Sequence, residues 1–195
     1  MTASPLIVLE RTVQLHQLLE QAGVAHAVGG ALALAYHVRE ARATRDIDLN
    51  VAVSADTPEK LFRLLPAEVP WGPLDVQRVR ESGQVRLLWP HPGGEPAIPL
   101  DLFFPQSDFH EQVNQRAEWV TMLDAVVPIV SATDLMVFKL LFDRRKDWAD
   151  IEELLRFGKV DVDFARSVLT AVVGSEDPRQ SKLDELLAEL SRGTA

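Results

Sequence analysis

Residues 28–53 read VGGALALAYHVREARATRDIDLNVAV, and the rest of the chain is organised around this stretch. Two glycines open a short apolar helix, a basic loop follows, and residues 46–53 are an expected strand. Asp46 and Asp48 share one face of that strand, because side chains alternate between its two faces. Two carboxylates about 4 Å apart repel by about 4 kcal/mol at an effective dielectric constant near 20. A divalent cation between them would turn this cost into binding, so the sequence poses a choice between a Mg²⁺ site and a solvated strand face.

The amino-acid composition limits the classes of function that this chain can have. The 195 residues are enough for one domain, or for one domain with a helical extension. A net charge of −9 excludes a global affinity for nucleic acid, so a polyanionic partner needs a local basic patch. The absence of cysteine excludes disulfides and thiolate metal sites and fits a cytoplasmic location. No apolar stretch approaches the roughly 20 residues of a membrane helix, so no membrane partner is expected.

The hydrophobic period changes near residue 130. Before it, the pattern predicts helices over 6–22, 31–38 and 57–65, and strands over 24–28, 46–53, 74–80, 85–89, 98–104, 119–123 and 125–130. After it, the pattern is helical, with helices over 131–142, 146–157, 163–173 and 178–190. We therefore expect an α/β part over residues 1–130 and an all-helical part over 131–195 that packs on it.

Asp101 strengthens the metal interpretation. It lies between Leu100 and Leu102 in an apolar strand, where aspartate is depleted and costly to bury. Together with Asp46 and Asp48 it gives three carboxylates from two neighbouring strands, an all-oxygen set suited to Mg²⁺ or Mn²⁺. Two such ions can clamp the attacking and leaving oxygens of a phosphoryl-type transfer. The competing interpretation is an edge-strand aspartate that faces water.

Other residues are suited to an anionic ligand. Gly29 and Gly30 stand at a strand-to-helix junction, where free N–H groups and the helix dipole favour a phosphate, although a tight turn alone also needs glycine. Arg42 and Thr44 precede the first aspartate and can bind phosphates, or else lie in a solvated loop. Lys139 falls on the apolar stripe of its helix, where a lysine either reaches outward to solvent or points at a bound anion.

These residues together resemble the nucleotidyltransferase superfamily of DNA polymerase β. The resemblance is carried by the glycine pair, by Arg42-x-Thr44-x-Asp46-x-Asp48 and by the later Leu-Asp101-Leu. The variant resembles the minimal nucleotidyltransferases of the AbiEii/AbiGii type, which are toxins of bacterial toxin–antitoxin and phage-defence systems. Those proteins carry helical motifs after the catalytic sheet. Two features of this chain resemble these motifs, namely Lys139 and the run Arg145-Lys146-Asp147-x-x-Asp150. The match covers roughly residues 24–157.

The resemblance implies an α/β (α+β) nucleotidyltransferase fold, with a mixed β-sheet and flanking helices as the catalytic core. It implies metal binding by Asp46, Asp48 and Asp101, with Asp101 also helping to deprotonate the acceptor. It further implies nucleotide binding by a second set of residues, namely Gly29, Gly30, Arg42, Thr44 and Lys139. An acceptor hydroxyl would attack the α-phosphate of an NTP in line, and pyrophosphate would leave. Whether Asp147 or Asp150 also belongs to the site stays open.

Two classes of function remain at this point. The first is a Mg²⁺-dependent nucleotidyltransferase, whose acceptor is an RNA or tRNA end, a protein or a small molecule such as an antibiotic, and which acts with or without an antitoxin partner. The second is a catalytically silent module that binds a partner, as an antitoxin or a regulator does. Three intact carboxylates argue against the second class, since they repel one another without a bound cation. A purely structural domain would require the three aspartates to lie apart.

Overall fold

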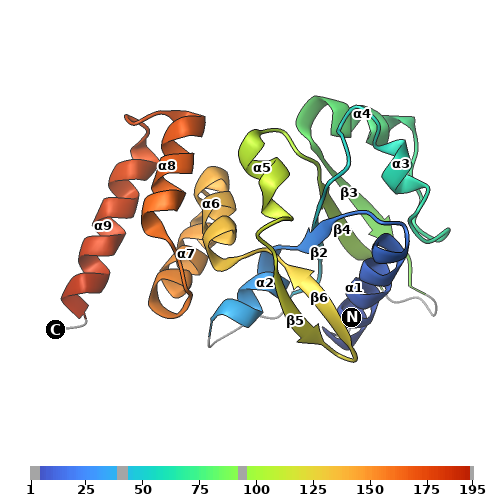
Figure 1. Cartoon of the computed structure of the whole chain (residues 1–195), viewed down its shortest axis with the longest axis horizontal. Helices are drawn as coiled ribbons and strands as arrows, with labels where there is room; N and C mark the ends of the chain where they lie inside the picture. The colour runs from blue at the N-terminus through green and yellow to red at the C-terminus, as the bar shows by residue number, and fades with distance from the viewer. Residues whose placement is uncertain (1–4, 39–43, 92–95, 194–195) are drawn as a thin grey trace. The chain divides into compact units, whose positions relative to one another are not determined.

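The computed structural model describes most of the chain, namely residues 5–38, 44–91 and 96–193 (Figure 1). The chain divides into two compact units. Of the described residues, the first unit contains 5–33 and 44–130, and the second contains 34–38 and 131–193. Within these described ranges no helix is both long and apolar enough to cross a membrane.

A six-stranded mixed sheet lies at the centre of the first unit. Its strands are β1 (His26–Val28), β2 (Ile47–Val51), β3 (Gln84–Trp89), β4 (Ile98–Phe103), β5 (Glu118–Met122) and β6 (Ala125–Ile129). They are ordered β3-β4-β2-β1-β6-β5. β2 pairs in parallel with β4, and β1 with β6, while the other neighbouring strands are antiparallel. The expected mixed sheet with flanking helices is confirmed.

Helices of the first unit cover the sheet and connect its strands. They are α1 (Pro5–Gln21), the first turn of α2 (Gly30–His37), α3 (Glu59–Phe62), α4 (Pro73–Ser82) and α5 (Asp108–Val113). α1 packs against β1 and β6, and α4 packs against β3. The buried face of α1 includes Val8, Leu15 and Leu19, which recur at helical spacing.

One face of the three strands at the β3 end of the sheet is apolar and buried, and the other, hereafter the polar face, carries their charged residues. The buried side chains are Ile47 and Leu49 of β2, Val85, Leu87 and Trp89 of β3, and Ile98, Leu100 and Leu102 of β4. Burying an aliphatic or aromatic side chain of this size contributes about 1.5–3 kcal/mol. Because the strands alternate, this apolar face fixes which intervening residues project from the opposite face.

The prediction of a strand over residues 74–80 is wrong, because this segment lies within helix α4. Val76 and Val79 are buried and three residues apart, whereas Leu74 is exposed. The helix begins with Pro73 at its first position, and the backbone N–H of Gly72 donates to Asp75 Oδ2 at 2.9 Å. Proline at the start and an acidic residue in the first turn are both helix-start signals that outweigh the short apolar alternation.

The second unit is helical, as expected for residues 131–195. Its main helices are α6 (Ala132–Phe142), α7 (Arg145–Phe157), α8 (Val162–Val173) and α9 (Pro178–Gly193), shown from pale orange to red in Figure 1. α6 packs against both α7 and α8, and α8 packs against α9. Ser131 caps α6 by accepting from the backbone N–H of Asp134 at 3.1 Å, as serine commonly does at the start of a helix. That this part packs on residues 1–130 stays a prediction.

Candidate functional site

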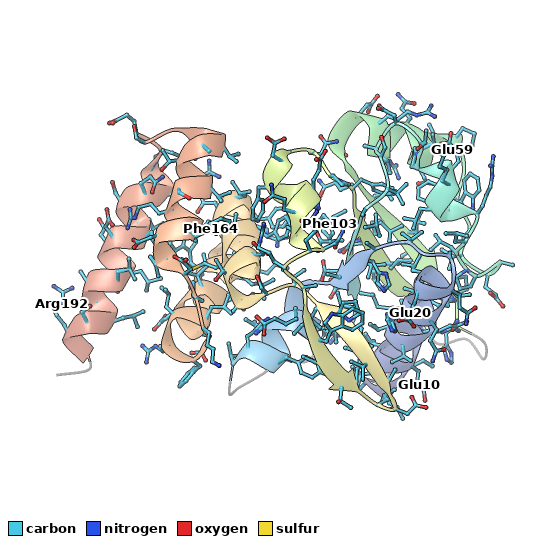
Figure 2. The ribbon with its side chains drawn as sticks, in the orientation of Figure 1. Glu10, Glu20, Glu59, Phe103, Phe164 and Arg192 are labelled. Carbon is cyan, nitrogen blue, oxygen red and sulfur yellow. The ribbon has the colours of Figure 1, made fainter. Side chains whose placement is uncertain are left out.

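Three charged residues form one row across β2, β4 and β3. The Cα atom of Asp48 in β2 is paired with that of Asp101 in β4, and Asp101 is paired with Arg86 in β3. Their apolar neighbours along each strand are buried on the opposite face, so all three side chains lie on the polar face. Phe103, labelled in Figure 2, marks the end of β4 two residues beyond Asp101.

Arg86 forms a bidentate ion pair with Asp101. Its Nε donates to Oδ1 at 2.7 Å and its Nη2 donates to Oδ2 at 2.5 Å. The Asp101 side chain is 14% exposed, whereas that of Arg86 is 58% exposed. Such fork-to-fork pairs are among the stronger hydrogen-bonded charge pairs in proteins. Both oxygens of Asp101 are therefore engaged by one guanidinium that itself remains open to solvent.

Asp46 completes the acidic group, hereafter the carboxylate triad of Asp46, Asp48 and Asp101. Its Oδ2 lies 3.7 Å from the same Nη2 of Arg86. Oδ2 of Asp46 and Oδ2 of Asp101 are therefore no more than about 6 Å apart, since both flank that nitrogen. The Thr44 hydroxyl donates to Asp46 Oδ1 at 2.6 Å and so orients this carboxylate just before β2 begins.

The neighbouring carboxylates shift the pKa of Arg86. Its hydrogen bonds to Asp101 raise the pKa of Arg86 above its ordinary value, against an opposing effect of burial. The negative charges of Asp101, Asp46 and Asp48 add to this rise in the pKa of Arg86. Asp101 and Asp46 thus lie beside one guanidinium, and Asp48 is near enough for its charge to act on the same group.

The glycine pair contacts Asp48 through its backbone. The N–H of Gly29 donates to the backbone carbonyl of Asp48 at 2.8 Å. Gly30 has a φ of +56°, and a Cβ built on it would meet the Asp48 carboxylate and lie 2.9 Å from Asp48 Cβ. Position 30 thus requires glycine for a steric reason as well as a conformational one, because the missing side chain leaves the space that the Asp48 carboxylate fills.

Gly30→Ala is expected to destabilise the protein more than Gly23→Ala does. Both glycines have positive φ, where alanine costs about 1–2 kcal/mol. No atom lies within 4 Å of a Cβ built on Gly23, so that variant measures the backbone strain alone. Urea unfolding of both variants gives the comparison. Equal losses would mean that the contact between Gly30 and Asp48 contributes nothing.

Asn50, the next residue on the polar face of β2, is covered by α5. The Asn50 side chain is buried and its Oδ1 accepts from His110 Nε2 at 3.0 Å. Burial lowers the pKa of His110 to about 4, so the imidazole is neutral at physiological pH. α5 itself begins at Ser107, whose hydroxyl oxygen accepts from the backbone N–H of His110 at 3.3 Å. The hydrogen bond between Asn50 and His110 therefore places an uncharged, buried pair next to Asp48 on the polar face.

Stability is expected to fall as pH is lowered from about 6.5 to 4. The pKa of His110 is lowered from 6.5 to about 4 by burial, so in this window the unfolded chain binds more protons than the folded one. Above pH 6.5 the protein has the full contribution of neutral His110 to its free energy of unfolding. About 3 kcal/mol of that free energy is lost by pH 4. Urea unfolding across this range checks it. His110→Gln, which does not titrate, is expected to flatten the profile, and an equally steep profile in that variant would contradict the assignment.

Lys139 and Asp150 form a buried ion pair within the second unit. Lys139 Nζ donates to Asp150 Oδ2 at 2.6 Å, and the two side chains are 6% and 8% exposed. Asp147, also buried, accepts from Arg144 through Nε at 2.7 Å and through the backbone N–H at 3.1 Å. Both aspartates thus have cationic partners of their own within this unit. The predicted contact of Lys139 with a nucleotide stays a prediction.

The carboxylate triad fits a divalent cation by chemistry and by backbone position. Hard oxygen donors are what Mg²⁺ and Mn²⁺ prefer, and directly paired positions on parallel strands bring two of them close together. The side chains are nevertheless arranged around Arg86. In the described part of the chain, no three Asp, Glu or His side chains are placed to hold a metal ion as they stand. A metal ion bound by both oxygens of Asp101 would thus require Asp101 and Arg86 to separate.

The sequence predictions for the site have mixed outcomes. The structure brings Asp46 and Asp101 beside one guanidinium, pairs Asp48 with Asp101 across neighbouring strands and places the glycine pair against Asp48. Arg42 lies outside the described residues. Sequence reasoning missed Arg86, although the signal was present. If the strand ending at Trp89 pairs antiparallel with the one beginning at Ile98, Arg86 falls opposite Asp101.

Comparison with known proteins supports the fold. No family model and no curated protein sequence matches the chain. The crystal structure of an antigenic nucleotidyltransferase-like protein from Paracoccidioides brasiliensis has 17% identity and a TM-score of 0.54, covering 95% of this chain and 88% of the other. Lincomycin-bound LnuA, a lincosamide antibiotic adenylyltransferase, has 18% identity and a TM-score of 0.47, covering 74% and 94%. The likeness to the first of these structures shows a nucleotidyltransferase-like fold.

Proposed function

We propose that this chain is a nucleotidyltransferase that uses a divalent cation to move a nucleoside monophosphate from an NTP to an acceptor hydroxyl. The observation that carries the proposal is the carboxylate triad on adjacent strands of a nucleotidyltransferase-like sheet. Fold alone does not determine function, because one fold carries many activities. The proposal therefore depends on the kind and placement of the side chains in the site.

Each residue has a defined part in the proposed reaction. Asp46, Asp48 and Asp101 would hold Mg²⁺ or Mn²⁺, which supplies charge stabilisation at the reacting phosphate when bound. Gly29 and Gly30 present backbone at the start of α2, where the helix dipole favours a triphosphate; the Gly29 N–H itself is already bonded to the Asp48 carbonyl. Thr44 holds the Asp46 carboxylate in place.

The proposed transfer exchanges one phosphorus–oxygen bond for another and moves one proton. The acceptor oxygen forms a bond to the α-phosphorus, and the bond from that phosphorus to the bridging oxygen of pyrophosphate breaks. Asp101 is the proposed acceptor of the hydroxyl proton. This role requires one of its oxygens to be clear of Arg86, because both are engaged in the ion pair.

The acceptor and the biological setting are further parts of the proposal. An RNA or tRNA end, a protein or a small hydroxylated molecule each suits the chemistry. The net charge of −9 favours a small acceptor or a short RNA end over a long RNA footprint. A role as an AbiEii-type toxin with an antitoxin partner rests on the sequence motifs alone, and so does a cytoplasmic location.

A second candidate function is a nucleotidyltransferase-fold module that binds a partner without catalysis. The bidentate pair of Arg86 with Asp101 favours it, because a carboxylate neutralised by an arginine needs no metal ion. The two candidates differ in whether nucleotide binding requires a divalent cation.

A nucleotide titration tests the proposal against this alternative. Each NTP is titrated into the full chain by calorimetry, with Mg²⁺ and with a chelator, in the wild type and in Asp48→Asn. The proposal predicts binding that requires Mg²⁺ and is weakened at least about tenfold by the substitution. Glu111→Gln, an exposed carboxylate on α5, is the matched control. Absence of Mg²⁺-dependent binding of every NTP would favour the binding module.

A further inference from the structure

We propose that Arg86 is an internal counter-cation that holds the carboxylate triad together without a metal ion and competes with a divalent cation for it. The inference rests on the proposed function, because it concerns the same three carboxylates. It makes Arg86 a positioning residue, acting on Asp101 and Asp46 rather than on the substrate. The competition would set how much divalent cation the site needs before it is occupied.

The first support is the geometry of Arg86. Its guanidinium takes both oxygens of Asp101, at 2.7 and 2.5 Å, and stands 3.7 Å from Asp46. The same atoms are the ligands that a hard divalent cation would need. A cation and the guanidinium therefore cannot both use the two oxygens of Asp101 in this way.

The second support is electrostatic. Three carboxylates on one strand face repel one another, and a single positive group among them offsets that repulsion. Asp101, Asp46 and Asp48 all act on Arg86, which shows that the guanidinium lies within the field of the whole triad. The triad is thus kept assembled in the absence of any bound ion.

The third support is that Arg86 is free to leave. Its side chain is 58% exposed and projects from the polar face of β3, so it can swing into solvent without opening the core. The backbone positions of Asp48 and Asp101 are fixed by the parallel pairing of β2 with β4. Replacement of Arg86 by a cation therefore needs side-chain rotations and no change of the sheet.

Binding of Mn²⁺ alone, without nucleotide, tests this inference. Calorimetric titration of the full chain compares the wild type with Arg86→Gln. We expect Arg86→Gln to bind Mn²⁺ about tenfold more tightly, which is 1.4 kcal/mol. Arg78→Gln is the matched control, because Arg78 is a similarly exposed arginine that pairs with Asp75 of α4. Its substitution makes the same change in net charge as Arg86→Gln. Its Mn²⁺ affinity is expected to equal that of the wild type.

A second measurement covers the case of altered folding. In chelator, Arg86→Gln is expected to unfold at lower urea than Arg78→Gln, and Mn²⁺ is expected to raise its midpoint more than that of the wild type. Arg86→Lys keeps the charge without the two parallel bonds, so its Mn²⁺ affinity should lie between those of the wild type and Arg86→Gln.

The outcomes separate the inference from the proposed function. If the wild type binds Mn²⁺ at a site that Asp48→Asn removes, but Arg86→Gln binds it no more tightly, the inference is overturned and the metal site stands. If neither the wild type nor Arg86→Gln shows an Asp48-dependent Mn²⁺ site, the metal site fails and the inference fails with it. A gain in affinity that Arg78→Gln reproduces reflects net charge and also overturns the inference.

Discussion

Replacement of Asp46 and Asp48 by alanine is expected to reduce nucleotide transfer by at least about a thousandfold while leaving the fold intact. Metal-supported charge stabilisation at a reacting phosphate is worth several kcal/mol, and each 1.36 kcal/mol is tenfold in rate. Both side chains lie on the polar face and outside the apolar core. Transfer is measured as label from an α-labelled NTP that becomes attached to an acceptor in bacterial lysate.

The control for this prediction removes two other carboxylates from the first unit. Asp56 and Asp124 are exposed, and Asp56→Ala with Asp124→Ala makes the same change in net charge. Transfer by this variant is expected to equal that of the wild type. Circular dichroism and urea midpoints establish that both double variants are folded. Undiminished transfer by the Asp46/Asp48 variant would rule out the proposed mechanism.

Lys139→Met is expected to cost about 3–5 kcal/mol of unfolding free energy, the largest stability effect in the account. The substitution removes the ammonium that pairs with Asp150 at 2.6 Å, where both side chains are almost fully buried. A buried carboxylate deprived of its cation has lost solvation that water would have supplied. Urea unfolding followed by circular dichroism measures the loss, since the second unit is helical.

Two comparisons give this prediction its specificity. Arg156 and Glu152 form an ion pair at the same 2.6 Å, but their side chains are 49% and 40% exposed. Arg156→Met should therefore cost less than about 1 kcal/mol. Lys139→Met combined with Asp150→Leu should regain most of the lost stability, because an apolar pair can replace a buried ion pair. A small loss in Lys139→Met would show that burial does not dominate this pair.

The doubly substituted chain also tests the role in nucleotide binding that the sequence predicts for Lys139. A stable Lys139→Met/Asp150→Leu variant separates folding from ligand contact. Weakened NTP binding in that variant would support a contact between Lys139 and the nucleotide. Unchanged binding would make Lys139 a structural residue of the second unit.

The sequence predicted the sheet well where hydrophobic alternation is strong. The strands that contain Leu49 and Leu100 were found because buried aliphatic residues alternate with polar ones. Residues 74–80 were misassigned, because a short segment with apolar residues two and three apart fits both periods. Helix α5 went unpredicted for a related reason, since a single turn and a half has almost no periodicity to detect.

The candidate site was predictable in its acidic residues but not in their partners. Asp46, Asp48 and Asp101 stand out because carboxylates are rare in apolar strands. The partner of Asp101 depends on strand register, and the pairing that places Arg86 beside it spans fifteen residues. The pairing of Lys139 with Asp150 joins two helices, and the apolar stripe alone did not distinguish a buried partner from a bound anion.

The fate of the two ends of the triphosphate distinguishes nucleotidyl transfer from other uses of an NTP. The full chain is incubated with Mg²⁺, lysate and either an α-labelled or a γ-labelled NTP, and RNA, protein and small-molecule fractions are separated. We expect the α label to enter one fraction and the γ label to be released as pyrophosphate. With the Asp46/Asp48 variant we expect neither the incorporation nor the release. Relative to lysate without added protein, extra transfer of γ label to an acceptor, or extra NTP consumption that the variant retains, would contradict a nucleotidyltransferase built on the carboxylate triad.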